Sequence, residues 1–129
     1  MSTSQLLVLA ATALASVSLP AAAQDAGERY VQIAEIEVDP AQLEAYKAAV
    51  KEQIEAAIRL EPGVLVLYAV SQRDNPNHVR VFEIYQNSAA YRSHLEATHF
   101  KKYKQTTEKM VTSLRLLQTE PIMLGGKSK

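Results

Sequence analysis

Residues 61–86, EPGVLVLYAVSQRDNPNHVRVFEIYQ, contain the two neighbouring strands that decide the fold. Residues 64–70 form a nearly continuous apolar run rich in branched side chains and too short for a typical helix, which predicts a strand buried on both faces. The turn signal RDNPN follows at residues 73–77, and residues 78–86 supply the hairpin partner. We therefore expect an antiparallel hairpin in the middle of the chain.

A strand and a helix precede this hairpin. Residues 30–38, YVQIAEIEV, alternate well enough to form a strand. Asp39 and Pro40 supply a helix start, because the carboxylate can accept from free amides and proline fits the first helical position. Apolar residues at spacings of three and four then predict a long helix that ends near Leu60, where Pro62 and Gly63 stop it.

Helical segments and a strand follow the hairpin. Asn87 and Ser88 cap a helix, and Thr98 starts a second helical piece whose apolar stripe extends from Phe100 to Leu114. Residues 115–124 form a final extended segment. The order strand, helix, strand, strand, helix, strand is the ferredoxin-like βαββαβ arrangement, an α+β sandwich with helices on one face of an antiparallel sheet.

The second face of this sheet also needs a cover. One helix layer covers one face, yet the predicted strand at residues 64–70 is apolar on both. A symmetric partner sheet is the simplest cover, so we expect a homodimer that forms a dimeric α+β barrel.

The first 23 residues differ in kind from the rest. An apolar run from Leu6 to Leu19 is followed by Pro20 and three alanines, the pattern of a secretory signal peptide cleaved after Ala23. An uncleaved anchor is disfavoured, because the run is short for a span of about 20 residues. We expect a secreted or periplasmic mature domain, residues 24–129, that does not contact the membrane after cleavage.

The composition narrows the partners. Fourteen Lys plus Arg balance fourteen Asp plus Glu, so no net charge favours nucleic acid. The absence of cysteine excludes disulfides and thiolate catalysis, and no glycine-rich nucleotide motif or G-x-S-x-G is present. A small neutral or weakly acidic partner is the most plausible one.

Glu83 and His94 are the candidate reactive groups. Strand parity places Glu83 on the side of Val81 and Tyr85, where a carboxylate needs either a Lys or Arg partner or a polar cavity in which it could orient a histidine. His94 lies on the apolar face of its helix, as a hydrogen-bonded core residue or as a catalyst. His99 would share its pocket only if the helix breaks near Thr98, since five residues of continuous helix separate the two by about 140°.

Other side chains bear on metal and ligand binding. The spacing H-x4-H lacks the registry of a helical zinc pair, and with no compact third ligand in view we expect no metal site. Four tyrosines could supply hydroxyl donors and aromatic walls, or simply pack the core: Tyr68, Tyr85, Tyr91 and Tyr103.

Two segments carry a family resemblance. EPGVLVLYAV at residues 61–70 and VFEIYQNSAAYRSHLEATHFKKY at residues 81–103, with E-x-Y, Ala-Tyr, His and Thr-His-Phe at this spacing, resemble the antibiotic biosynthesis monooxygenase family over roughly residues 30–124. The resemblance implies a dimeric α+β barrel with a small pocket in each subunit. It also implies a cofactor-free monooxygenase that oxidises a small hydroxylated aromatic or quinol with O2. Haem degradation is disfavoured, because Lys104 stands about where related haem-degrading enzymes present a histidine.

The resemblance implies catalytic and substrate-binding roles for the candidate residues. His94 is the candidate base and Glu83 its orienter or a second base, while Tyr68, Tyr85, Tyr91, His99 and Tyr103 bind substrate. Two alternatives remain open: an isomerase or tautomerase that moves a proton with the same groups, and a binding module without turnover.

Overall fold

The computed structural model describes residues 28–128, so the expected signal peptide lies outside the described residues. The elements in chain order are β1 (Tyr30–Val38), the 3-10 turn η2 (Pro40–Gln42), α2 (Leu43–Leu60), β2 (Val64–Gln72), β3 (Asn75–Tyr85), α3 (Ser88–Glu96), α4 (Thr98–Thr107) and β4 (Val111–Thr119). None of the helices in this part of the chain is long and apolar enough to span a membrane.

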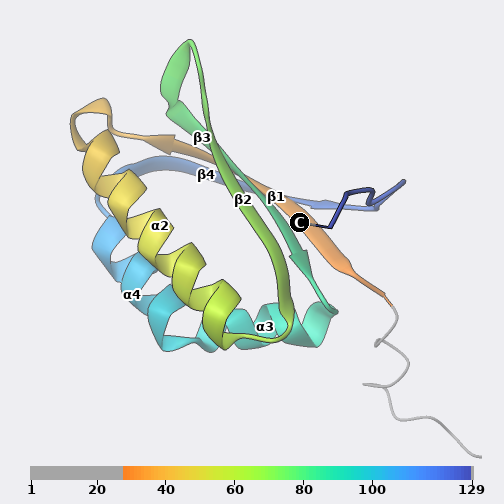
Figure 1. Cartoon of the computed structure of the whole chain (residues 1–129). Coiled ribbons are helices and arrows are strands. Elements are labelled where there is room, and N and C mark those ends of the chain that lie inside the picture. Colours follow the sequence, from red (N-terminus) through yellow and green to blue (C-terminus); the bar gives the residue numbers. More distant parts are fainter. Residues whose placement is uncertain (1–27, 129) are drawn as a thin grey trace, which may run out of the picture.

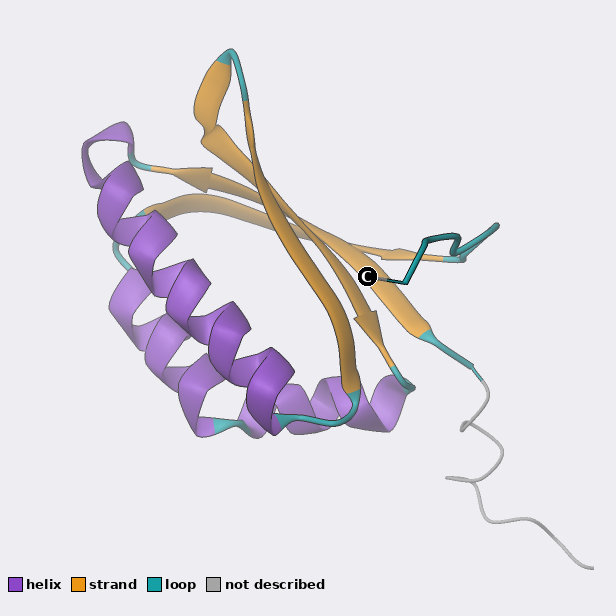
Figure 2. Cartoon of the chain, in the orientation of Figure 1, coloured by secondary structure: helices purple, strands orange, loops and turns teal. Residues whose placement is uncertain are grey.

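The strands form one antiparallel sheet in the order β2-β3-β1-β4. The three α-helices lie together on one face of this sheet, and α2 runs alongside α4 (Figure 1). Figure 2 shows the resulting two layers, with helices on one side and strands on the other. The predicted ferredoxin-like α+β fold is confirmed.

Side-chain caps set the element boundaries. The Asp39 carboxylate accepts from the Ala41 N–H at 3.0 Å and so starts η2, which leads into α2. The Asn87 side chain accepts from the Ala90 N–H at 2.9 Å and starts α3. β3 begins at Asn75, earlier than predicted, because a tight turn places Gln72 opposite Asn75.

The boundary between α4 and β4 differs from the prediction. The helix ends at Thr107 rather than continuing to Leu114, and β4 begins at Val111. The Met110 N–H donates to the Thr107 carbonyl at 2.9 Å in a turn, and the Asp39 N–H donates to the Met110 carbonyl at 2.8 Å. Pairing with β1 therefore overrides the helical spacing of the apolar residues, as β-branched Val111 and Thr112 favour.

The core lies between the helices and the sheet. It contains buried residues from α2 and from β1, β2 and β3, among them Tyr46, Ala57, Val64, Val79 and Tyr85. The face of β2 turned away from the helices is open in a single chain, with Tyr68 65% and Val70 60% exposed. The prediction that this strand is buried on both faces is therefore wrong for the single chain, because the helices cover one face alone.

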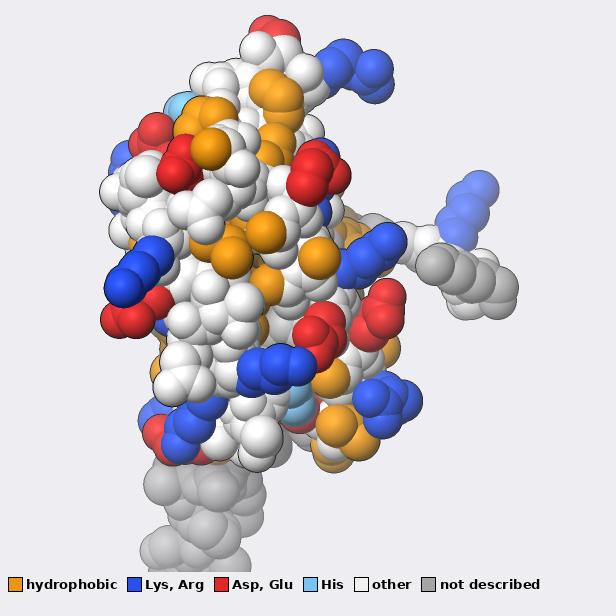
Figure 3. Space-filling view, turned by 90° about the vertical axis from the view of Figure 1, so that its left-hand side faces the viewer, with side chains coloured by type: hydrophobic (Ala, Val, Ile, Leu, Met, Phe, Trp, Pro, Cys, Tyr) orange, Lys and Arg blue, Asp and Glu red, His pale blue; other side chains and the backbone are white. Residues whose placement is uncertain are grey.

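The outer surface of the helix layer carries charges of both signs, with exposed hydrophobic side chains among them. Figure 3 looks onto the side of the molecule where α2 and α4 lie, and shows basic and acidic side chains interspersed there. This face therefore presents no field of a single sign.

Candidate active site

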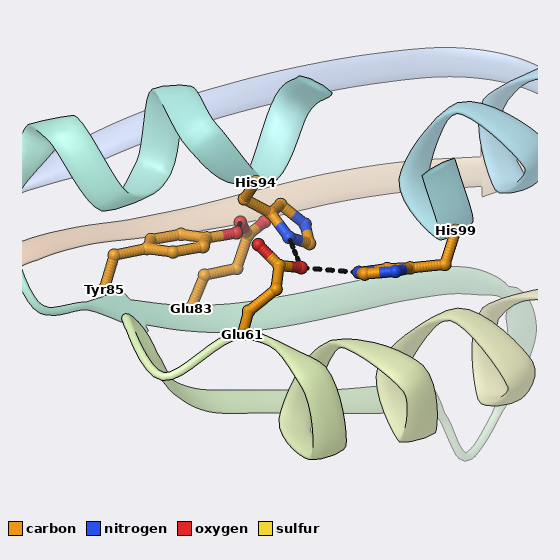
Figure 4. A network of polar contacts seen from close by, with 5 residues as sticks. All are labelled: Glu61, Glu83, Tyr85, His94 and His99. Atoms are coloured by element: carbon orange, nitrogen blue, oxygen red, sulfur yellow. Dashed lines mark hydrogen bonds and ion pairs between the residues drawn. The ribbon is translucent and has the colours of Figure 1, made fainter. Parts of the chain in front are cut away.

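A helix break brings two histidines to one place. Ala97 ends α3 and precedes α4, and its extended backbone (φ −67°, ψ 141°) turns the second helix away from the first. The ring centroids of His94 and His99 lie 6.2 Å apart. The break predicted near Thr98 is confirmed, and both imidazoles point toward the same point between the helices (Figure 4).

Glu61 occupies that point. It follows the last residue of α2, and its carboxylate oxygen Oε2 lies 2.8 Å from Nδ1 of His94 and 2.5 Å from Nε2 of His99. The turn after it fits closely against α3, since a Cβ on Gly63 would come within 2.6 Å of the Cβ of Ala90. Sequence reasoning gave Glu61 no role. The usable signal was an acidic residue held by Pro62 and Gly63 at the end of a helix.

This carboxylate fixes the tautomer of His94. A carboxylate accepts hydrogen bonds, so Nδ1 of His94 carries the proton and donates it to Glu61. The side chain is only 2% exposed, and this burial lowers its pKa, although Glu61 acts in the opposite direction. At neutral pH the imidazole is therefore uncharged, and Nε2 keeps a free lone pair that can accept a proton.

Glu61, His94 and His99 are also the candidates for holding a metal. Their ligand atoms all lie within 4.8 Å of one another, so the structure supplies the third ligand that the sequence did not reveal. Two of the separations, 2.8 and 2.5 Å, are hydrogen-bond lengths. Ligand atoms in a tetrahedral zinc site, with bonds of about 2.0–2.1 Å, stand roughly 3.3 Å apart. The geometry is therefore that of a hydrogen-bonded acid–base network.

Glu83 forms a separate buried network with two other residues. Its Oε1 accepts from Nε2 of Gln32 at 3.1 Å and from the Tyr85 hydroxyl at 2.5 Å. Burial raises the pKa of Glu83 although both hydrogen bonds act to lower it. The expectation that Glu83 pairs with a Lys or Arg or orients His94 is therefore wrong. Strand pairing sets Gln32 opposite Glu83, and His94 is already bound by Glu61.

A cavity of about 270 Å³ adjoins both networks. Its polar lining includes Gln53, Glu83 and His94, and its walls come from Tyr85, Tyr91, Tyr103, Val50, Leu67, Val81, Leu95 and Phe100, among others. Phe100 lies against His94 with ring centroids 4.7 Å apart. An engineered apolar cavity of about 150 Å³ can hold benzene, so the space here admits an aromatic ring with substituents.

The sequence-predicted residues divide into two groups. Glu83, Tyr85, Tyr91, His94 and Tyr103 all line the cavity. His99 stands behind Glu61, outside the lining. Tyr68 lies on the open face of the sheet, because its position in β2 has the opposite parity to Leu67, which does line the cavity.

Fold and site together define a ferredoxin-like α+β domain with a histidine–glutamate pair beside a largely apolar cavity. The chain belongs to the antibiotic biosynthesis monooxygenase family, whose model matches residues 29–106. A search among curated proteins finds no match.

Solved structures agree with this assignment. A protein from Bacteroides thetaiotaomicron, described as a "putative antibiotic biosynthesis monooxygenase", is 50% identical with a TM-score of 0.76, and the match covers 81% of this chain and 99% of that one. A protein from Lactobacillus acidophilus, described as a "putative monooxygenase", is 29% identical with a TM-score of 0.70, over 71% of this chain and 44% of its own. A Nitrosomonas europaea protein, 24% identical with a TM-score of 0.71 over 78% of this chain and 96% of its own, shares the fold.

Proposed function

We propose that the protein is an exported, cofactor-independent monooxygenase that oxidises a small hydroxylated aromatic, in particular a quinol, with O2. The observation that carries the proposal is the buried His94, whose Nδ1 is bound to Glu61 and which lines a largely apolar cavity of ring size. Family membership supports the reaction class.

The first step is removal of a proton from a substrate hydroxyl. Nε2 of His94 accepts it, and the Glu61 carboxylate stabilises the imidazolium that forms. The resulting phenolate is electron-rich enough to react with O2 at a ring carbon. The apolar walls favour this by excluding water from the reacting atoms.

The later steps use the same groups and O2 as the oxidant. A bond forms between one oxygen atom and the ring carbon, and His94 returns its proton to give a hydroperoxide. Glu83 then removes the hydrogen of that carbon as a proton while the O–O bond breaks, and the departing hydroxide takes this proton from Glu83 and leaves as water. A quinol thereby loses four electrons to O2 and becomes a hydroxyquinone, and no other reductant is consumed.

The assembly and location are part of the proposal. Tyr68 and Val70 on the open face of β2 support a homodimer in which a second copy covers this face. The apolar segment at the N-terminus supports export to the periplasm or the medium.

An oxygen electrode with a panel of quinols tests the activity. We expect O2 uptake by the purified protein and a loss of about 10²- to 10⁴-fold in His94→Ala, the usual range for a general base. His78→Ala is the matched control, because His78 pairs with Glu37 at the far end of β3 and outside the cavity lining. Full turnover without O2 would instead identify an isomerase or tautomerase that uses the same base.

A further inference from the structure

Gln53 has a buried acceptor that the fold leaves unused. The residue lies on α2, is 6% exposed and lines the cavity. Within residues 28–128, its Oε1 is the one buried side-chain nitrogen or oxygen atom without a hydrogen-bond partner. Leaving such a group unpaired costs stability, so its presence indicates a partner that arrives with the ligand.

The position of Gln53 separates it from the acid–base groups. It precedes Glu61 by eight residues, which corresponds to about 12 Å along the axis of α2 at 1.5 Å per residue. Glu83, Tyr85 and His94 lie together at the Glu61 end (Figure 4). The lining also includes apolar Val50, Leu67 and Val81, and Lys104 of α4. Gln53 is thus a polar group of the cavity that is separate from the acid–base groups.

We propose that Gln53 accepts a hydrogen bond from a second hydroxyl of the substrate, so that the site selects aromatic diols with oxygens on opposite sides of the ring. The inference rests on the proposed function and names the residue that selects a quinol over aromatics with a single hydroxyl. One hydroxyl meets His94 and Glu83, where it is deprotonated. The other meets the side-chain amide of Gln53, whose Oε1 is enclosed by protein and turns toward the ligand on binding to accept the bond. The amide holds the ring in place without taking part in proton transfer.

Anaerobic calorimetric titration tests this binding without any turnover. The probes are 1,4-dihydroxynaphthalene and 1-naphthol, which differ by the second hydroxyl. We expect the wild-type protein to bind the diol about 10-fold more tightly, the factor that one net hydrogen bond supplies. In Gln53→Met, which keeps the length of the side chain without its polar atoms, the two ligands should bind equally.

Gln105→Met is the matched control, since Gln105 is exposed on α4 and outside the cavity lining, and it should keep the preference. Gln53→Met should be at least as stable as the wild-type protein to urea, because it removes an unpaired buried polar atom. If the wild-type protein binds the diol and 1-naphthol equally, water in the cavity satisfies Gln53 and the inference is overturned. A preference for the diol that survives in Gln53→Met would overturn it as well.

The outcomes separate this inference from the proposed function. A Gln53-dependent preference for the diol without O2 uptake would remove the monooxygenase and keep the diol site. O2 uptake together with a preference for the diol that does not depend on Gln53 would keep the monooxygenase and remove the role of Gln53.

Discussion

Replacing Glu61 by Gln changes one atom of the network and should alter three measurable properties. The side chain keeps its size but loses the charge that holds the Nδ1 proton of His94 and the Nε2 proton of His99. Hydrogen bonds to charged groups contribute more than neutral ones, and the amide oxygen can replace part of each, so we expect a loss of about 1–3 kcal/mol in the free energy of unfolding.

The pKa of His94 should fall further in this variant. Burial already lowers it below the ordinary 6.5, and the Glu61 carboxylate is the group that acts to raise it. Because the folded-state pKa lies below the unfolded one, His94 contributes stability that is present above pH 6.5 and is lost as the pH falls toward the folded value. Without Glu61 the folded-state pKa of His94 falls further, so the pH range over which this stability is lost extends to lower pH. The pH below which turnover declines because His94 is protonated should fall in the same way.

Turnover should fall by about 10²-fold or more, because the imidazolium formed during proton transfer loses its stabilising charge. Urea denaturation, NMR titration of the histidine ring protons and O2 uptake measure the three effects. Glu52→Gln is the control, since Glu52 lies on α2, the helix that Glu61 follows, and forms an exposed pair with Lys102. If His94 titrates at the same pH in Glu61→Gln and the wild-type protein, the carboxylate does not control the base and the reasoning fails.

Three further predictions concern stability and assembly. Glu83→Gln mimics the protonated form of a carboxyl whose pKa is raised by burial. The thermal stability of this variant should exceed that of the wild-type protein by an amount that grows as the pH rises above 4.5. A difference in thermal stability that stays constant with pH would contradict this. Gly63→Ala should lower the free energy of unfolding by about 1–3 kcal/mol in urea, because the new methyl group meets Ala90, whereas Gly126→Ala, with no atom within 4 Å of the added Cβ, should change nothing. Sedimentation equilibrium should give twice the chain mass, and Tyr68→Lys on the open sheet face should shift it toward the monomer; a monomeric wild-type protein would refute the dimer.

Local signals explain why the fold was predictable. The side chains of Asp39 and Asn87 cap their helices through bonds to backbone two and three residues on, and such contacts can be inferred from a few neighbouring letters. Alternation in residues 30–38 likewise gave β1 with its observed bounds. The end of α4 could not be found this way, because the pairing of β4 with β1 decides it and that contact joins residues about 75 positions apart.

The site was predictable only in part for the same reason. The break beside Thr98 and the inward face of His94 follow from local pattern, and both are confirmed. The partner of His94 could not be predicted from local pattern, because Glu61 lies at the end of another helix, 33 residues away in sequence. Tyr68 illustrates a parity error: it neighbours the cavity-lining Leu67 in sequence, and successive strand residues point to opposite faces.

The most direct test of the central claim is a single turnover of a quinol under ¹⁸O2, with the product analysed by mass spectrometry. We expect one ¹⁸O atom to enter the hydroxyquinone and the other to appear in water, and we expect His94→Ala to slow both by about 10²- to 10⁴-fold. A product without the label, or formation of product at the full rate in the absence of O2, would contradict it.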